Sequence, residues 1–373
     1  MKKNLTVMIK PSSSKCNLKC KYCFYNSIAE EREVMDYGFM SEESLEIIVD
    51  RIEEYCDGGV CNMGFQGGEP MLIGLEFYKK LIEYTKEKST KFNFMLQTNG
   101  TLINHDFAEL FYDNKFFLGV SLDGSEELHN LNRINHVNNG SFKDVMNGIE
   151  LLKKYKVDFN ILVVVTQALS KKIENCYEFL RKNNFNYIQF IPFIEALDDW
   201  NNNNLNFHLT SKDYEAYIKK LFDMWYDDIS KGNMVSIRYF DNILGLFLGY
   251  DYEACDMRGV CSCQHIIESD GKVYPCDFYT YEKYSIGNII NESFDEIHEK
   301  ELAKNFIINS PNKDKKCEVC KYRALCRGGC KRYRESSKDK GYLFCDANYN
   351  FFDYSYDRFR EIAIKISKGE LKY

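Results

Sequence analysis

Short runs of apolar and β-branched residues alternate with longer amphipathic stretches from residue 5 to about residue 230. The short runs have the length and composition of buried strands. Because strands that alternate with helices form parallel sheets with helical crossovers, this part is predicted to be an α/β fold. Six such units, with a cysteine loop directly after the first strand, predict a partial (β/α)6 TIM-like barrel, open on one side. The six predicted strands are residues 5–10, 61–66, 92–98, 116–122, 159–165 and 187–191.

The amphipathic stretches begin at residues that favour helix N-termini. Ser41 precedes two glutamates and then apolar residues at helical spacing, and Ser141 opens a second such stretch. Thr210 opens a third, which closes at Gly232. These signals predict helices between the strands. In a barrel of this kind the chemistry sits at the carboxyl ends of the strands, so the polar residues that follow each strand are the candidate site.

The pattern changes near residue 235, where cysteines become dense, strands become short and turn pairs such as Asp270-Gly271 become frequent. We therefore predict two domains, residues 1–234 and residues 235–373, the second one stapled by metal. Residues 350–373 are predicted to form a closing amphipathic helix.

Composition and charge exclude several classes of protein. The chain has 373 residues, of which 45% are hydrophobic, and a net charge of −7, which disfavours sequence-independent nucleic-acid binding. Its start lacks the apolar region of a secretory signal, and the longest apolar run, Ile161 to Val165, is too short to span a membrane. We expect a cytoplasmic protein that needs neither membrane nor nucleic acid, and for which a monomer suffices.

The 15 cysteines are the most informative residues. A reducing compartment argues against disulfides, and clustering argues for metal ligands. Three cysteines lie between Cys16 and Cys23, and nine lie between Cys255 and Cys345. The three outside these clusters are predicted to be core or incidental residues. They are Cys56, Cys61 and Cys176.

The first cluster has the spacing Cys16-x3-Cys20-x2-Cys23. Three thiolates leave a structural zinc ion one ligand short. They leave one iron of a cubane cluster open, so that a chelating amino acid could bind there. The loop resembles the motif of the radical S-adenosylmethionine (SAM) superfamily, and the resemblance continues through Gly67-Gly68-Glu69-Pro70.

By that resemblance the loop holds a [4Fe–4S] cluster that binds SAM. Alone, Gly-Gly-Glu-Pro is also typical of an ordinary turn. His129 and Arg133, four residues apart, would also suit a surface helix pair. The resemblance implies the following SAM contacts: Tyr22, Gly67, Gly68, Glu69, Gln97, Asn99, Ser121 and Arg133.

The second cluster supplies eight thiolates, enough for two complete four-cysteine sites. Sequence alone leaves open which cysteine joins which site, and zinc is a serious alternative for an isolated array of this kind. The array resembles the SPASM extension of radical SAM enzymes, which carries two auxiliary [4Fe–4S] clusters. By that resemblance one cluster is held by Cys255, Cys261, Cys276 and Cys330, with Cys263 left as a local alternative to Cys261. The other is held by Cys317, Cys320, Cys326 and Cys345.

The chain resembles the anaerobic sulfatase-maturating enzymes through segments 16–25, 65–70 (FQGGEP), 96–100 (LQTNG), 235–241 (VSIRYFD) and 274–279 (YPCDFY). That family oxidises a cysteine or serine of a sulfatase to Cα-formylglycine through a 5′-deoxyadenosyl radical. The resemblance implies that Asp277 is the general base, and that Tyr25 and Gln66 hold the substrate peptide. It also implies a sulfatase polypeptide or peptide as substrate and a low-potential electron donor of the flavodoxin or ferredoxin type.

Each of these three residues also has a plain structural interpretation. A carboxylate beside a cluster can simply bond to backbone groups, and Tyr25 and Gln66 can be wall residues. The alternative enzyme is a SPASM peptide maturase that forms thioether or carbon–carbon crosslinks in a ribosomal peptide. A different class, a zinc-stapled binding module, leaves the three-cysteine loop unexplained. Whether the target is cysteine or serine stays open.

Overall fold

The computed structural model describes residues 2–195, 197, 207–336 and 341–373. Contacts divide the chain into two compact units. The first contains residues 1–122, 129–159 and 262–308, and the second contains residues 123–128, 160–261 and 309–373. The units interleave along the chain, so the domain ranges 1–234 and 235–373 remain a prediction.

The first unit is built on a sheet with the strand order β10-β9-β8-β1-β2-β3-β4. Strands β1, β2, β3 and β4 pair in parallel in that order, and β8 pairs in parallel with the other side of β1. Strands β9 and β10 extend the sheet beyond β8 through antiparallel pairs. The first four predicted strands are confirmed to within one residue at each end. The strands are β1 (Asn4–Lys10), β2 (Val60–Phe65), β3 (Lys91–Thr98), β4 (Phe117–Ser121), β8 (Ile266–Glu268), β9 (Lys272–Tyr274) and β10 (Gly287–Asn288).

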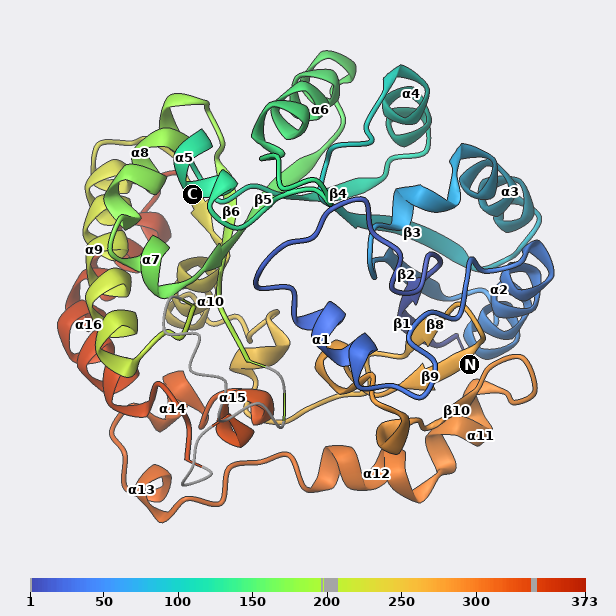
Figure 1. The fold of residues 1–373 in the computed structure, drawn as a ribbon. Coiled ribbons are helices and arrows are strands. Elements are labelled where there is room, and N and C mark those ends of the chain that lie inside the picture. The colour runs from blue at the N-terminus through green and yellow to red at the C-terminus, as the bar shows by residue number, and fades with distance from the viewer. Residues whose placement is uncertain (1, 196, 198–206, 337–340) are drawn as a thin grey trace. The chain divides into compact units, whose positions relative to one another are not determined.

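Helices α2, α3, α4 and α6 cover one face of β1–β4, and α1 lies on the other face (Figure 1). Helix α2 shows why these residues fold in this way. The Ser41 side chain accepts a hydrogen bond from the Ser44 N–H, and apolar residues at helical spacing turn inward and are buried. The helices are α1 (Phe24–Glu30), α2 (Glu42–Cys56), α3 (Leu75–Lys86), α4 (His105–Asp113) and α6 (Phe142–Tyr155).

Ser141 precedes helix α6, as predicted, but its side chain does not cap the helix. Its hydroxyl donates to the Arg133 carbonyl oxygen at 3.0 Å and contacts Nε2 of the buried His129 at 2.9 Å. The serine therefore fixes residues 129–133, a segment that approaches the cysteine loop.

The second unit contains the parallel strands β5 (Phe159–Val165), β6 (Tyr187–Pro192) and β7 (Ser236–Ile237). Helix α9 (Ser211–Ser230) packs between α8 (Ile173–Lys182) and α16 (Cys345–Ser367), as Figure 1 shows. Thr210 precedes α9, as predicted, and forms a capping box with Asp213. The closing helix begins at Cys345, earlier than the predicted residue 350.

Short elements complete the two units, and the prediction of an α/β fold with parallel strands and a cysteine-rich C-terminal part is confirmed. Cys56, Cys61 and Cys176 are fully buried, as predicted. None of the described helices combines the length and the apolarity needed to cross a membrane. The remaining helices are α5 (Glu126–Asn130), α7 (Gln167–Ser170), α10 (Arg238–Phe247), α11 (Phe294–Glu299), α12 (Glu301–Ile308), α13 (Lys315–Glu318), α14 (Arg323–Cys326) and α15 (Lys331–Glu335), with 3-10 turns at Pro70–Ile73, Cys255–Met257, Asp277–Tyr279 and Glu282–Tyr284.

A pair of histidines joins β8 to helix α11 in the first unit. His265 Nδ1–H donates to the Thr6 carbonyl oxygen at 2.9 Å, and its Nε2 lies 2.6 Å from Nε2 of His298. Only one of the two facing nitrogens can carry a hydrogen without repulsion. Burial lowers the pKa of His265 to about 4 and also lowers the pKa of His298.

This pair predicts a loss of stability in mild acid. An unfolded histidine binds a proton near pH 6.5, whereas folded His265 does so only near pH 4, so the unfolded state binds more protons between these values. The free energy of unfolding should therefore fall by about 1 kcal/mol from pH 7.5 to pH 5.5 because of His265. Thermal unfolding at both pH values measures this change.

The variant His265→Asn should lose most of this pH dependence, because asparagine tolerates the positive φ of 48° at this position and does not titrate. The exposed His105 supplies the control, and His105→Asn should behave like the wild type. An unaltered pH dependence in His265→Asn would show that the pair is not its source.

Candidate active site

The first cysteine cluster lies on the loop that follows strand β1. Cys16 and Cys20 lie in the loop, and Cys23 caps helix α1, where its sulfur accepts a hydrogen bond from the Asn26 N–H at 3.4 Å. Backbone bonds from Lys19 N–H to the Ile134 oxygen and from Lys21 N–H to the Asn132 oxygen hold the loop at 2.7 and 3.0 Å. The loop is therefore fixed by the segment that Ser141 holds in place.

Burial makes the thiols of this loop poor acids. It raises the pKa of Cys16 to about 12, with the nearby Glu69 carboxylate adding to the effect, and it raises the pKa of Cys23 as well. Such thiols stay protonated at neutral pH unless a bound metal stabilises the thiolate. Three sulfur donors on one short loop fit the open-sided iron–sulfur site that the spacing predicts.

Gly67 and Gly68 allow the end of strand β2 to touch this loop. Gly68 N–H donates to the Ser13 oxygen at 2.9 Å, and Glu69 N–H donates to the Lys15 oxygen at 2.8 Å. A Cβ atom on Gly68 would lie 2.0 Å from the Lys15 oxygen, and Gly67 has a φ of +135°. No other residue type fits this backbone contact without moving it.

Glu69 is a fully buried carboxylate at the same strand end. It accepts hydrogen bonds from Met71 N–H at 3.1 Å, from the Thr98 hydroxyl at 2.8 Å and from Asn99 N–H at 2.8 Å. Burial nevertheless raises its pKa to about 7. Within the described chain no cation forms an ion pair with Glu69, so a bound ammonium group would stabilise its charge.

The other predicted SAM contacts lie around the loop in the same unit. The Asn99 amide donates to Asn17 Oδ1 at 2.8 Å and lies 3.9 Å from Cys16 Sγ. Arg133 is buried rather than on the surface, and its guanidinium lies 5.3 Å from the Tyr22 ring centroid and near Cys23. Half-buried Gln97 and Ser121 lie at the ends of β3 and β4.

Asp277, the predicted base, meets a lysine that sequence reasoning missed. Lys10 is the last residue of β1 and its side chain is 0% exposed. Its Nζ lies 2.6 Å from Asp277 Oδ1 and 3.9 Å from the Tyr25 ring centroid. The available signal was a lysine closing an otherwise apolar strand, at Ile9-Lys10-Pro11.

The two predicted substrate-binding residues, Tyr25 and Gln66, differ in whether their polar atoms already have hydrogen-bond partners. The Tyr25 hydroxyl is buried and donates to Glu268, which also pairs with Arg32 Nη2 at 2.7 Å. The amide oxygen of Gln66, which follows β2, is buried and accepts no hydrogen bond from any described residue. Gln66 therefore still has a buried acceptor to offer, whereas Tyr25 uses its hydroxyl within the fold.

Seven of the eight predicted auxiliary ligands lie in the second unit, in two groups. Burial raises the pKa of Cys330 to about 12, and the charges of Asp256, Cys255 and Cys261 add to this effect. Burial raises the pKa of Cys326 to about 11, and Cys345, Cys317 and Cys320 add to it. Cys276 and Cys263 belong to the first unit, so their place in either group remains a prediction.

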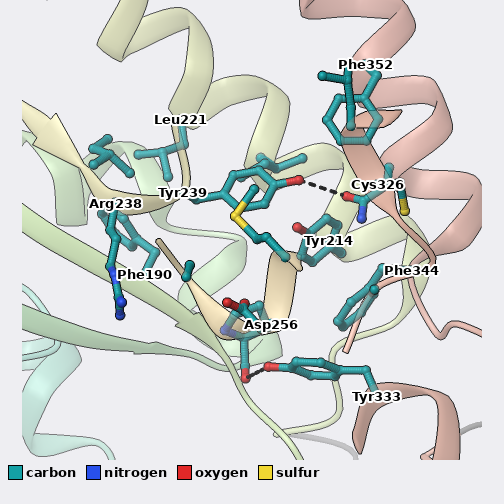
Figure 2. A pocket seen from close by; sticks show the side chains of 18 of the residues that line it. Phe190, Tyr214, Leu221, Arg238, Tyr239, Asp256, Cys326, Tyr333, Phe344 and Phe352 are labelled. Atoms are coloured by element: carbon teal, nitrogen blue, oxygen red, sulfur yellow. Dashed lines mark hydrogen bonds between the residues drawn. The ribbon is translucent and has the colours of Figure 1, made fainter. Parts of the chain in front are cut away.

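A cavity in the second unit lies beside Cys326 and was not anticipated from the sequence (Figure 2). Tyr239 donates a hydrogen bond to Asn348 Oδ1 at 3.3 Å, and Tyr333 donates one to the Pro192 oxygen at 2.7 Å. The aromatic wall thus directs its polar atoms to partners within the protein. Its lining includes Phe190, Tyr214, Leu221, Arg238, Asp256, Phe344 and Phe352.

Two family profiles match the chain. Residues 11–180 match the radical SAM superfamily, and residues 255–322 match an iron–sulfur cluster-binding domain known as SPASM. The first match includes the loop from Cys16 to Cys23, and the second includes the cysteines from Cys255 to Cys320.

Relatives extend the similarity to nearly the whole length. The cysteine-type anaerobic sulfatase-maturating enzyme of Clostridium novyi is 42% identical over 367 residues, which cover 97% of this chain and 98% of that enzyme. The serine-type enzyme of Bacteroides thetaiotaomicron is 30% identical, with coverage of 94% and 89%.

Solved structures agree with the sequence comparison. Native anSMEcpe with bound AdoMet and the Cp18Cys peptide superposes with a TM-score of 0.91 at 41% identity, covering 98% of this chain and 100% of that one. Streptococcus suis SuiB bound to its precursor peptide SuiA has a TM-score of 0.64 at 18% identity and shares the fold alone. The chain belongs to the family of anaerobic sulfatase-maturating enzymes, within the radical SAM superfamily.

Proposed function

We propose that this enzyme oxidises the target cysteine of a sulfatase to Cα-formylglycine, using SAM and three [4Fe–4S] clusters. The observation that carries the choice of target is the 42% identity to the cysteine-type enzyme over 97% of the chain, against 30% for the serine-type enzyme. A buried, unpartnered amide oxygen at Gln66 supports peptide binding, because it can accept a backbone N–H of the substrate.

The cysteine loop and the glycine-rich strand end have the donors that the cofactor needs. Cys16, Cys20 and Cys23 would hold the site cluster. Glu69 offers a buried carboxylate to the ammonium group of SAM, and Arg133 offers a buried guanidinium to its carboxylate. When bound, the cofactor supplies a 5′-deoxyadenosyl radical that removes a hydrogen atom from the Cβ of the target residue.

The protein must then take a proton from the thiol. Asp277 is suited to this task, because it is a carboxylate that is 16% exposed at the end of β1 and is paired with Lys10. A positioned carboxylate accelerates such proton transfers by about 10²–10⁴-fold. The substrate radical must also lose one electron, which the auxiliary clusters would accept, and water would then hydrolyse the resulting thioaldehyde to the aldehyde with release of hydrogen sulfide.

The other expectations follow from this chemistry and from composition. We propose a low-potential electron donor of the flavodoxin or ferredoxin type, a monomeric enzyme, and a cytoplasmic location. The net charge of −7 supports the absence of a nucleic-acid partner. Crosslinking of a ribosomal peptide remains the alternative, and the likeness to SuiB supports only a common fold.

A direct assay tests the proposal. Anaerobic incubation with SAM, a strong reductant and a sulfatase-motif peptide should give an aldehyde from the cysteine peptide and much less from the serine peptide. Mass spectrometry with a hydrazine trap is required, because oxidation of serine and crosslinking both remove two hydrogens. Release of 5′-deoxyadenosine without a trapped aldehyde from either peptide would reject the proposal.

Iron analysis tests the ligand assignment. Three cubane clusters predict about 12 iron atoms per chain after anaerobic reconstitution. Loss of one auxiliary ligand in Cys345→Ala should lower the content to about 8. Cys263→Ala is the matched control and should stay near the wild-type value, whereas iron loss in Cys263→Ala together with full iron content in Cys261→Ala would exchange these two cysteines in the assignment.

Asp277→Asn should separate the two half-reactions. SAM cleavage should continue, because the base acts after the radical forms, while the aldehyde yield should fall by about 100-fold or more. Chromatography of 5′-deoxyadenosine and mass spectrometry of the peptide measure both products. Asp270→Asn, which changes an aspartate beside Lys272 on a neighbouring turn, is the control. Full aldehyde yield in Asp277→Asn would remove Asp277 from the mechanism.

A further inference from the structure

Lys10 is an unusual residue for the end of a strand, because its ammonium group is buried completely. Burial of an unpaired ammonium costs several kcal/mol, so a lysine in such a place needs a close counter-charge. The side chain that provides it is Asp277, at 2.6 Å. Neither the fold of β1 nor the packing of the sheet requires a cation at this position.

Lys10 and Asp277 interact through their opposite charges. Lys10 Nζ and Asp277 Oδ1 are close together, but they lack the alignment of a hydrogen bond. The ring of Tyr25 lies 3.9 Å from the ammonium and binds it through its π face. Lys10 is thus held on one side by an aromatic face and holds a carboxylate oxygen on the other.

A second buried ion pair fixes the position of Tyr25. Its hydroxyl donates to Glu268, and the Arg32 and Glu268 side chains, both 0% exposed, are 2.7 Å apart. Arg32 Nε also donates to the backbone carbonyl oxygen of Thr280 at 2.8 Å, and the Thr280 hydroxyl donates to the backbone carbonyl oxygen of Asp277 at 3.3 Å. The turn that carries Asp277 and the tyrosine that holds Lys10 are therefore parts of one rigid network.

We propose that Lys10 is the positioning residue for the base of this reaction, an inference that rests on the proposed function. By holding Oδ1 of Asp277 against the end of β1, it fixes the carboxylate, so that the second oxygen remains to accept the thiol proton of the substrate. Tyr25 would act through Lys10: its hydroxyl is bonded to Glu268 and holds the ring in place, and the ring holds the ammonium group of Lys10. A lysine with a purely structural role would affect folding but would leave the fate of the substrate radical unchanged.

The test compares three variants in the reconstituted holoenzyme. Lys10→Met keeps the length of the side chain and removes the charge, whereas Lys10→Arg keeps the charge. Lys272→Met is the control, because it removes a half-buried lysine of strand β9 that pairs with Glu282. The readouts are aldehyde formed per 5′-deoxyadenosine released, and kcat and KM for the cysteine peptide. Iron content and thermal unfolding show whether each variant is intact.

In Lys10→Met, aldehyde per deoxyadenosine should fall by about 10- to 100-fold, mostly in kcat, while the rate of SAM cleavage stays within about 2-fold. Lys10→Arg should recover part of the coupling, and Lys272→Met should resemble the wild type. Wild-type coupling in an intact Lys10→Met enzyme would overturn the proposal. Equal losses in Lys10→Met and Lys10→Arg would also contradict it, because the charge would then not matter.

A double-mutant cycle covers the remaining outcomes. If Lys10 acts through Asp277, the loss in Lys10→Met combined with Asp277→Asn should be no larger than in Asp277→Asn alone. Additive losses would show independent roles and overturn the proposal. If Lys10→Met does not fold, Lys10→Gln replaces it in the cycle. Should the wild-type enzyme cleave SAM but form no aldehyde, the proposed function fails, and this result is distinct from any result on Lys10.

Discussion

The candidate site depends on one close contact between two pieces of backbone. The end of strand β2 donates hydrogen bonds from Gly68 and Glu69 to the loop that carries the cysteines, and the gap admits no Cβ atom at Gly68. This contact sets the distance between the thiols and Glu69. It also places the carboxylate beside its hydrogen-bond partners, which come from the 3-10 turn that follows β2 and from the end of β3. Geometry thus requires glycine at position 68, and we propose that the charge of the bound ligand requires the acid at position 69.

Buried charges form the second constraint on the site. The Lys10–Asp277 and Arg32–Glu268 pairs lie in the same unit and are joined through Tyr25. Replacing such pairs by apolar residues often leaves stability unchanged or improved, so stability alone is a weak reason to keep them. A chemical reason is stronger, because a base that accepts a proton from the substrate needs its carboxylate held in place by fixed charges.

Sequence patterns predicted the elements well and the polar contacts poorly. Strand and helix-start signals are local, so the strand at residues 159–165 and the helix start at Thr210 were predicted correctly. Cysteine spacing indicated the clusters for the same reason. Lys10 and Asp277 are 267 positions apart in the sequence, and only the parallel pairing of β1 with β8 brings their segments together. Ser141 is a residue type that favours helix caps, yet its hydroxyl donates to the carbonyl oxygen of Arg133 instead. Tertiary packing decides between these two partners.

The pairing of β8 with β1 depends on the path that the chain takes between the two units. Residues 262–308 return to the first unit after the chain has built much of the second, and β8 joins the free edge of β1. Asp277 follows from this edge and therefore belongs to the same compact unit as the cysteine loop, Glu69 and Lys10. A base at Asp277, as we propose, would therefore be built into the same unit as the loop that would hold the site cluster. The contact of Lys10 with Asp277 is thus formed within one unit.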